Sequence, residues 1–265
     1  MTLTTDISDF ARRDLRFDGK TKPVFTLGER GPAVIVMAEV FGFTPHVARF
    51  CRWVRDGGMR VYAPILIGTP DAGNKTEITL GRTLGLCISR EFTVLASNRS
   101  SPVTDWLRGL ARLAHQECGG PGVGAIGMCL TGGFALSMAI DPVMLAPVLS
   151  QPSLPALNPA ALDISPADLA KVQARTRDEG LQIRGYRFAG DTLCRGQRFE
   201  TLARAFGDAF IGVTLPDAVA NQEGMASRGK PPHSVFTADL IDAAGEPTRA
   251  AADEVIAFFR ARLAA

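Results

Sequence analysis

Apolar runs and amphipathic segments alternate along most of this chain. The run at 33–40 begins as a continuous apolar stretch, which is typical of a strand buried on both faces of a sheet. The next segment, 45–58, has apolar residues at i, i+3, i+4 and i+7, with a proline in its first turn and two glycines at its end. This pattern predicts an amphipathic helix. Residues 59–66 then predict a second buried strand.

The same alternation continues toward the C-terminus and is broken at 67–100, where turn-forming residues dominate. Loops of this length tend to be functional. Strands that alternate with helices predict a mostly parallel central sheet with helices on both faces. Without repeats or linkers, we expect one α/β domain over residues 1–265. Further strands are expected at 14–17, 23–27, 123–128, 143–150, 181–190 and 209–215, and further helices at 101–120, 132–140, 165–180, 195–207 and 252–263.

The composition excludes several classes of function. Apolar residues make up 46% of the 265 and charged residues 21%, which is an ordinary globular balance. A net charge of +2 without a basic run predicts neither a nucleic-acid nor a membrane partner. Five scattered cysteines without a C-x-x-C pair argue against a disulfide framework and a zinc site. With no apolar leader and no apolar stretch of about 20 residues, we expect a cytoplasmic protein that holds no metal.

Candidate chemistry is sought outside the carboxyl ends of the strands, where ligands bind in parallel sheets. His46 and His115 lie on predicted helices and are more typical of packing or surface positions. Other chemically capable side chains come just after predicted strands or in the loop that follows the last strand: Glu39, Cys129, Asp191 and His233. Two of these have an ordinary alternative, since Asp191 could cap the following helix and His233 could be an exposed loop residue.

Cys129 lies between a predicted strand and a predicted helix, in the stretch GAIGMCLTGG. A nucleophile at such a turn is held in a strained conformation and needs small neighbours, which Gly127, Gly132 and Gly133 supply. The turn also places the backbone N–H of Leu130 at a helix N-terminus, where it can donate to an oxyanion and where the dipole favours a thiolate. Taken alone, the stretch fits a small buried cysteine equally well.

The order of the candidates along the chain favours the nucleophile. Cys129, Asp191 and His233 follow one another in the order nucleophile, acid, histidine, which is that of the α/β-hydrolases. In such a triad the histidine takes the thiol proton, and the aspartate fixes the tautomer of the histidine and stabilises the imidazolium. A coincidental match at three positions is much rarer than at one, so we expect Cys129 to be catalytic.

Together with Glu39, these residues make the sequence resemble the dienelactone hydrolase family, the cysteine branch of the α/β-hydrolases. The resemblance implies an α/β-hydrolase fold and a hydrolase that needs no cofactor. It extends over nearly the whole chain. The motifs that carry it are the elbow GMCLTGG at 127–133, which follows the family's G-x-C-x-G-G from Gly127 except at Thr131, the E-x-F-G segment at 39–42, the G-D step at 190–191 and the H-S segment at 233–234.

The resemblance also implies roles for two neighbouring residues. In the family, a glutamate at the position of Glu39 contacts the resting thiol and helps to deprotonate it when substrate arrives. The N–H of the next residue, here Val40, completes the oxyanion hole beside that of Leu130. A carboxylate at the end of a buried strand is seldom there for packing, although a salt-bridged structural glutamate is the alternative.

Three features depart from the family pattern. Thr131 replaces the second glycine of the elbow, so either its hydroxyl finds a partner or the helix lies farther from the strand. Thr237 stands where the family usually has an arginine that binds the glutamate and a substrate carboxylate. The segment 67–100 is unlike that of the family, and its Arg82 and Arg90 are the candidates there for binding an anionic substrate.

The sequence therefore predicts a hydrolase that cleaves a carboxylic ester or lactone through a cysteinyl acyl-enzyme. Cys129 attacks the carbonyl carbon, His233 carries the proton, Asp191 orients His233 and Glu39 tunes the thiolate. The same triad acting on a thioester or an organophosphate ester is an alternative, as is a non-catalytic binding protein of the same fold. The expected partner is a small-molecule substrate, and the chain is expected to be a monomer or a small homo-oligomer.

Overall fold

The computed structural model describes residues 6–67, 100–224 and 229–264. Its strands are β1 (Ala11–Phe17), β2 (Lys20–Leu27), β3 (Ala33–Met37), β4 (Arg60–Pro64), β5 (Val123–Met128), β6 (Met144–Ser150), β7 (Ile183–Phe188) and β8 (Phe210–Leu215). Within the described ranges they form one sheet in the order β1-β2-β4-β3-β5-β6-β7-β8. The β1–β2 and β2–β4 pairs are antiparallel and the other neighbours are parallel. The predicted mostly parallel sheet is therefore confirmed.

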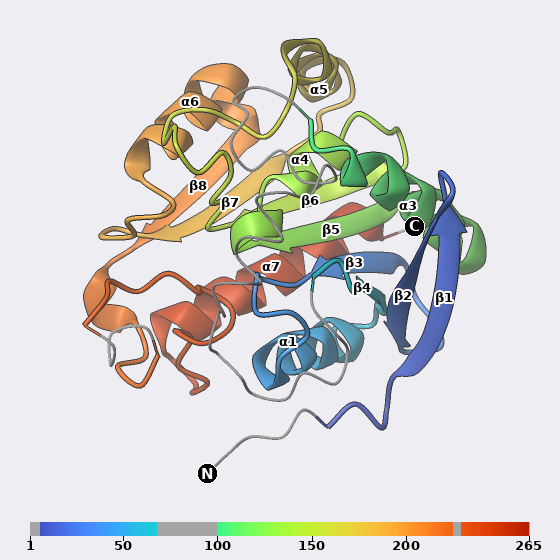
Figure 1. Cartoon of the computed structure of the whole chain (residues 1–265), viewed down its shortest axis with the longest axis horizontal. Helices are drawn as coiled ribbons and strands as arrows, with labels where there is room; N and C mark the ends of the chain where they lie inside the picture. Colours follow the sequence, from blue (N-terminus) through green and yellow to red (C-terminus); the bar gives the residue numbers. More distant parts are fainter. Residues whose placement is uncertain (1–5, 68–99, 225–228, 265) are drawn as a thin grey trace.

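Helices cover both faces of the sheet, as the alternation of elements predicts (Figure 1). One face carries α1 (Pro45–Asp56) and α7 (Pro247–Leu263), and the other carries α3 (Val103–Cys118), α4 (Phe134–Met138), α5 (Pro166–Asp178) and α6 (Gly196–Phe206). Each face has its own cluster of buried apolar side chains, one around Trp106 and Phe134 and the other around Phe50 and Phe259. The central strands β3 and β5 are buried along their whole length, which explains their continuous apolar runs.

The ends of several helices follow the signals in the sequence. Thr44 caps α1 by accepting a hydrogen bond from Val47 N (3.4 Å), and Ser165 caps α5 in the same way. The segment 132–140 differs from the prediction of one continuous helix. A 3₁₀ turn at Cys129–Thr131 comes first, and the short α4 follows. The reason is the left-handed φ of 57° at Cys129, with which an α-helix cannot start directly at the end of β5.

The strand register decides which residues meet at the carboxyl edge of the sheet. Met37 of β3 pairs with Gly127 of β5, so the residues two positions further on, Glu39 and Cys129, leave the sheet side by side. Met128 pairs with the last residue of β6, and Phe188 pairs with the last residue of β8. The strands β5 to β8 therefore end at the same edge, where the segments that follow them begin. Strand pairing thus brings Glu39 and Cys129 to the same edge as the segment that carries Asp191, whereas His233 lies in the longer segment after β8.

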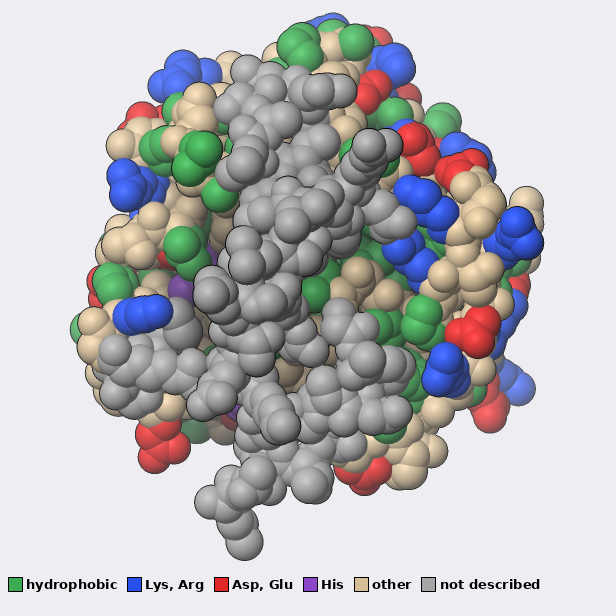
Figure 2. Space-filling model, viewed as in Figure 1, with side chains coloured by type: hydrophobic (Ala, Val, Ile, Leu, Met, Phe, Trp, Pro, Cys, Tyr) green, Lys and Arg blue, Asp and Glu red, His purple; other side chains and the backbone are tan. Residues whose placement is uncertain are grey.

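The surface charges, the apolar helices and the cysteines complete the description of the fold. On the face in Figure 2, the Lys and Arg side chains of the described residues are mixed with Asp and Glu. Among the described helices none is both long and apolar enough to cross a lipid bilayer. The four cysteines within the described ranges, at positions 51, 118, 129 and 194, are free thiols.

Candidate active site

The turn after β5 has the geometry of a nucleophile elbow. Cys129 has a φ of 57°, a conformation that few residues other than glycine adopt, and its side chain is 6% exposed. A Cβ at Gly127 would lie 2.0 Å from Thr131 O, and one at Gly132 would lie 2.5 Å from the Cα of Pro152. The small neighbours that the sequence provides are therefore required, because the backbone segments of the turn nearly touch.

Thr131, which departs from the family pattern, is fully buried and its hydroxyl has partners. Its Oγ1 accepts a hydrogen bond from Met128 N (2.9 Å) and lies within donating distance of Met37 O (3.0 Å) and Ala38 O (3.2 Å). Of the two possibilities raised for this residue, the hydroxyl has therefore found a partner. It links the elbow to the end of β3, where the backbone continues to Val40.

His233 and Asp191 form a buried pair, with 4% and 3% of their surfaces exposed. The ring Nδ1–H of His233 donates to Asp191 Oδ2 at 2.7 Å. The other carboxylate oxygen accepts from the backbone N–H groups of Leu193 (2.9 Å) and Cys194 (3.0 Å), so Asp191 is held from two sides. This division leaves Nε2 of His233 as the nitrogen that is free to exchange protons.

The charge state of His233 follows from its neighbours. Burial lowers the pKa of His233, but the negative charge of Cys129, the hydrogen bond to Asp191 and a hydrogen bond to Cys129 outweigh it, and the pKa is raised well above its ordinary value. The neighbours Cys129 and Asp191 therefore favour the protonated form of His233.

A further carboxylate at this edge of the sheet, that of Glu39, accepts hydrogen bonds from three side chains. Its Oε1 accepts hydrogen bonds from Thr237 Oγ1 (2.7 Å) and Gln151 Nε2 (2.9 Å), and its Oε2 accepts one from Ser234 Oγ (3.1 Å). Burial raises the pKa of Glu39, although the hydrogen bonds from Thr237 and Ser234 and the charge of His233 act in the opposite direction. All three donors are neutral, and Thr237 occupies the position where the resemblance expects an arginine.

The contact of Glu39 with the resting thiol, which the resemblance implies, differs from this arrangement. Among the hydrogen bonds of the described residues, none joins Glu39 to Cys129. A hydroxyl within hydrogen-bonding distance of the thiol belongs to Ser153, whose Oγ donates to Cys129 Sγ at 3.5 Å. The same Oγ lies 3.4 Å from His233 Nε2.

Sequence reasoning missed several residues that shape this site. Asp239 is fully buried, and its Oδ2 accepts from the backbone N–H groups of His233 and Ser234, both at 2.8 Å. Gln151 and Ser153 follow β6 directly, so the rule that directs attention to strand ends could have found them. The signal was weak because neither residue belongs to a motif of the family.

Arg198 of α6 holds the segment that carries Ser153. It is 1% exposed, and burial lowers its pKa. Its guanidinium donates to four backbone carbonyls, those of Pro152 (2.6 Å), Pro155 (2.8 Å), Asn158 (2.9 Å) and Ala161 (3.0 Å). An amphipathic helix pattern gives no sign that one of its polar positions is buried in this way.

One part of the expected site falls outside the residues that the structure describes. Arg82 and Arg90 lie outside the described residues, as does most of the segment 67–100.

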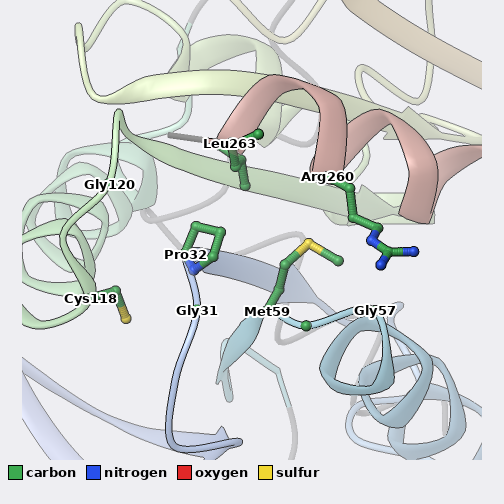
Figure 3. A pocket seen from close by; sticks show the side chains of 10 residues that line it. Gly31, Pro32, Gly57, Met59, Cys118, Gly120, Arg260 and Leu263 are labelled. Carbon is green, nitrogen blue, oxygen red and sulfur yellow. The ribbon is translucent and has the colours of Figure 1, made fainter.

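A pocket of about 440 Å³ lies at the opposite edge of the sheet, where β3, β4 and β5 begin (Figure 3). Pro32, Met59 and Arg260 are among the residues that line it, and none of the predicted site residues does. The carboxyl-edge constellation is therefore separate from this pocket.

Comparisons with known proteins agree with the resemblance. The model of the dienelactone hydrolase family matches residues 22–151. A candidate dienelactone hydrolase from Klebsiella pneumoniae subsp. pneumoniae has a similar structure, with a TM-score of 0.65, 19% identity, and coverage of 94% of this chain and 97% of that one. No curated protein sequence matches the chain.

Two further solved structures share the fold at low identity. A dienelactone hydrolase-like promiscuous phosphotriesterase from metagenomic libraries has a TM-score of 0.60 and 17% identity, with 94% of this chain and 96% of that one covered. An α/β serine hydrolase without a lid from Xanthomonas campestris has a TM-score of 0.56 and 12% identity, with 97% of both chains covered. The predicted α/β-hydrolase fold is confirmed.

Proposed function

We propose that the chain is a member of the dienelactone hydrolase family, whose model matches residues 22–151, and that it hydrolyses a carboxylic ester or lactone. The proposal assigns catalysis to Cys129, His233 and Asp191. The observation that carries it is the strained Cys129 beside a buried His233–Asp191 pair whose Nδ1–Oδ2 distance is 2.7 Å. Three reactive groups from three separate strand ends have no structural reason to converge in this way.

The acylation step uses the thiolate–imidazolium pair. The thiolate of Cys129 attacks the carbonyl carbon, a C–S bond forms, and the carbonyl oxygen becomes an oxyanion that the N–H groups of Val40 and Leu130 stabilise. When the tetrahedral intermediate collapses, the ester C–O bond breaks. His233 Nε2–H then gives its proton to the departing alkoxide, which leaves as an alcohol, or stays attached if the substrate is a lactone.

Deacylation reverses these roles with water as the nucleophile. His233 Nε2 takes a proton from water, the resulting hydroxide attacks the thioester carbon, and the C–S bond breaks to release the acid and restore the thiolate. Asp191 keeps Nδ1 protonated throughout. Glu39 supports both steps by its charge and by its hydrogen bond from Ser234, the neighbour of His233 (3.1 Å).

The substrate is proposed to be uncharged near Glu39. Thr237 donates a neutral hydrogen bond to Glu39 (2.7 Å) at the position where the family usually places an arginine that also binds a substrate carboxylate. Without that cation, a carboxylate in the substrate would meet the negative charge of Glu39 without compensation. This supports a neutral ester or lactone over an anionic dienelactone.

The decisive experiment compares the parent chain with Cys129→Ala on p-nitrophenyl acetate. We expect turnover to fall to the background rate while the circular dichroism spectrum stays the same, because only the nucleophile is removed. Cys118→Ala is the matched control and keeps full activity. Turnover in Cys129→Ala at the parental rate would contradict the mechanism.

Thiol labelling gives a second test that needs no substrate. Burial raises the pKa of the Cys51 and Cys194 thiols, so both react slowly with iodoacetamide at neutral pH. Cys129 is expected to be alkylated first. If Cys129 reacts no faster than Cys51, the chain is a binding protein of this fold rather than an enzyme.

A panel of an oxygen ester, a thioester and a phosphotriester distinguishes the remaining alternatives. We expect the oxygen ester to be turned over fastest. One structural neighbour is a promiscuous phosphotriesterase, so the phosphotriester is the informative competitor. A higher kcat/KM for the thioester or the phosphotriester would keep the triad and change the substrate class.

A further inference from the structure

The thiol of Cys129 has a hydroxyl neighbour that none of the motifs includes. Ser153 Oγ donates to Cys129 Sγ at 3.5 Å and lies 3.4 Å from His233 Nε2, so it stands beside both partners of the proposed ion pair. A hydroxyl has one proton to donate and two lone pairs to accept with. It can therefore donate to the thiolate while it accepts the Nε2–H of the imidazolium.

The position of Ser153 is fixed by the backbone on either side of it. Its own N–H donates to Cys129 O at 2.9 Å, and Gln151 N donates to Tyr186 O at 2.7 Å. The carbonyl of the intervening Pro152 accepts from the buried guanidinium of Arg198 at 2.6 Å. These bonds join the segment to the elbow, to β7 and to α6, so the hydroxyl is held at the thiol rather than placed there by a mobile side chain.

The carboxylate of Glu39 does not compete for this place. Both of its oxygens accept hydrogen bonds from other side chains, those of Gln151, Thr237 and Ser234. The other acceptor within reach of the Ser153 hydroxyl is Gln151 O at 3.1 Å. That carbonyl is neutral, and a hydrogen bond to an ionised sulfur is the stronger of the two.

We propose that Ser153 is a further catalytic residue, whose hydroxyl stabilises the resting thiolate of Cys129 by a charge-assisted hydrogen bond. The proposal rests on the proposed function, since it needs Cys129 to be the nucleophile. The thiol proton resides on His233 Nε2, and the hydroxyl proton stays on Ser153 throughout. Once substrate is bound, the Nε2–H of His233 donates to the leaving oxygen. The Ser153 hydroxyl keeps its hydrogen bond to Cys129 Sγ until the C–S bond forms.

The test measures the rate of Cys129 alkylation by iodoacetamide as a function of pH in Ser153→Ala. Loss of one hydrogen bond to a charged group corresponds to about one pH unit. The midpoint of the alkylation profile is therefore expected to move upward by about one unit, with roughly tenfold slower alkylation below the midpoint. Ser153→Thr, which keeps the hydroxyl, is expected to retain the parental midpoint.

Controls separate this role from a merely structural one. Ser165→Ala removes a hydroxyl that caps α5 and is expected to leave the midpoint unchanged. Ser153→Gly is a second hydroxyl-free variant and should reproduce the shift if Ser153→Ala folds poorly. A midpoint in Ser153→Ala and Ser153→Gly that equals the parental one, or lies below it, overturns the proposal.

The two proposals fail in different ways. If Cys129→Ala still turns over p-nitrophenyl acetate, the proposed function fails whatever the alkylation profile shows. If Cys129→Ala is inactive and the Ser153→Ala profile is parental, the function stands and the role of Ser153 is refuted. Because alkylation needs no substrate, the second result does not depend on knowing the natural ester.

Discussion

Replacing Thr131 by valine removes one hydroxyl and keeps the outline of the side chain almost unchanged. In the parent chain, that hydroxyl accepts from Met128 N (2.9 Å) and reaches Met37 O at 3.0 Å. Thr131→Val therefore leaves a buried backbone N–H without its acceptor and separates the elbow from the end of β3. The residue is fully buried, so water does not replace the lost partner.

The size of the effect follows from these two bonds. A buried N–H left unpaired costs about 1–3 kcal/mol, and a lost neutral hydrogen bond costs about 1 kcal/mol. The methyl group of valine recovers up to about 0.8 kcal/mol by burial. The net loss in the free energy of unfolding is therefore about 2 kcal/mol, which lowers Tm by roughly 4–8 °C in a chain of this size.

Activity should fall as well, because Thr131 joins the two segments that carry the proposed oxyanion-hole amides of Val40 and Leu130. A displaced donor of this kind costs up to about 100-fold in rate. We expect kcat for p-nitrophenyl acetate to fall by about tenfold or more in Thr131→Val. KM should change less, since the ground-state ester makes weaker contacts with the amides.

Thermal unfolding followed by circular dichroism, together with steady-state kinetics, measures both effects. Thr131→Ser keeps the hydroxyl and is the matched control, with kcat close to that of the parent. The reasoning is refuted if Thr131→Val melts within about 1 °C of the parent and keeps its kcat. In that case the Thr131 hydroxyl would contribute neither to stability nor to turnover.

Two charged side chains, Arg198 and Glu117, give further predictions. Arg198→Met removes the donors of four carbonyls, including that of Pro152 (2.6 Å), and is expected to lower the free energy of unfolding by about 3 kcal/mol in urea titrations. A loss below about 1 kcal/mol in the free energy of unfolding, extrapolated to water, would contradict this. Glu117 accepts hydrogen bonds from Arg13 (2.7 Å) and Tyr62 (2.7 Å), and the Arg13 bond lowers its pKa from 4.5 to about 2. Because the pKa is depressed in the folded state, its stabilisation is present above pH 4.5 and is lost as pH falls toward 2. Glu117→Gln should thus cost roughly 1–2 kcal/mol at pH 7, with the gap to the parent closing in acid, whereas the exposed Glu200→Gln should show no such pH dependence.

Much of the fold could be predicted because its signals are local. A strand such as β5 and a helix such as α1 are each specified by a short apolar pattern and by residues at their ends. The rule that chemistry lies after strand ends predicted Cys129, Asp191 and His233 as site residues, and the structure pairs His233 with Asp191. The 3₁₀ turn at Cys129–Thr131 was not predicted, because the positive φ at Cys129 depends on the crossing of the strand and the turn and not on a local propensity.

The rest of the site depends on contacts between distant residues, which a single sequence does not encode locally. Ser153 meets Cys129 because β6 lies next to β5, and the only sign of this in the sequence is its place just after a predicted strand. The three neutral donors to Glu39 come from two different segments. Thr237 was identified as a departure from the family pattern, but its hydrogen bond to Glu39 required the structure.

The hydrogen bonds of Glu39 also bear on how the protein folds. Its partners Ser234 and Thr237 lie 195 and 198 residues further along the chain, and Gln151 lies 112 residues further along. Closing loops of this length lowers the chain entropy before the hydrogen bonds form. Contacts between residues far apart in the sequence therefore form slowly. The turn at Cys129 is local by comparison, with Gly132 N donating to Cys129 O, yet His233 reaches it only when the chain between Glu39 and Ser234 is closed. Recovery of ester turnover during refolding therefore marks the assembly of the sheet from β3 to the segment beyond β8.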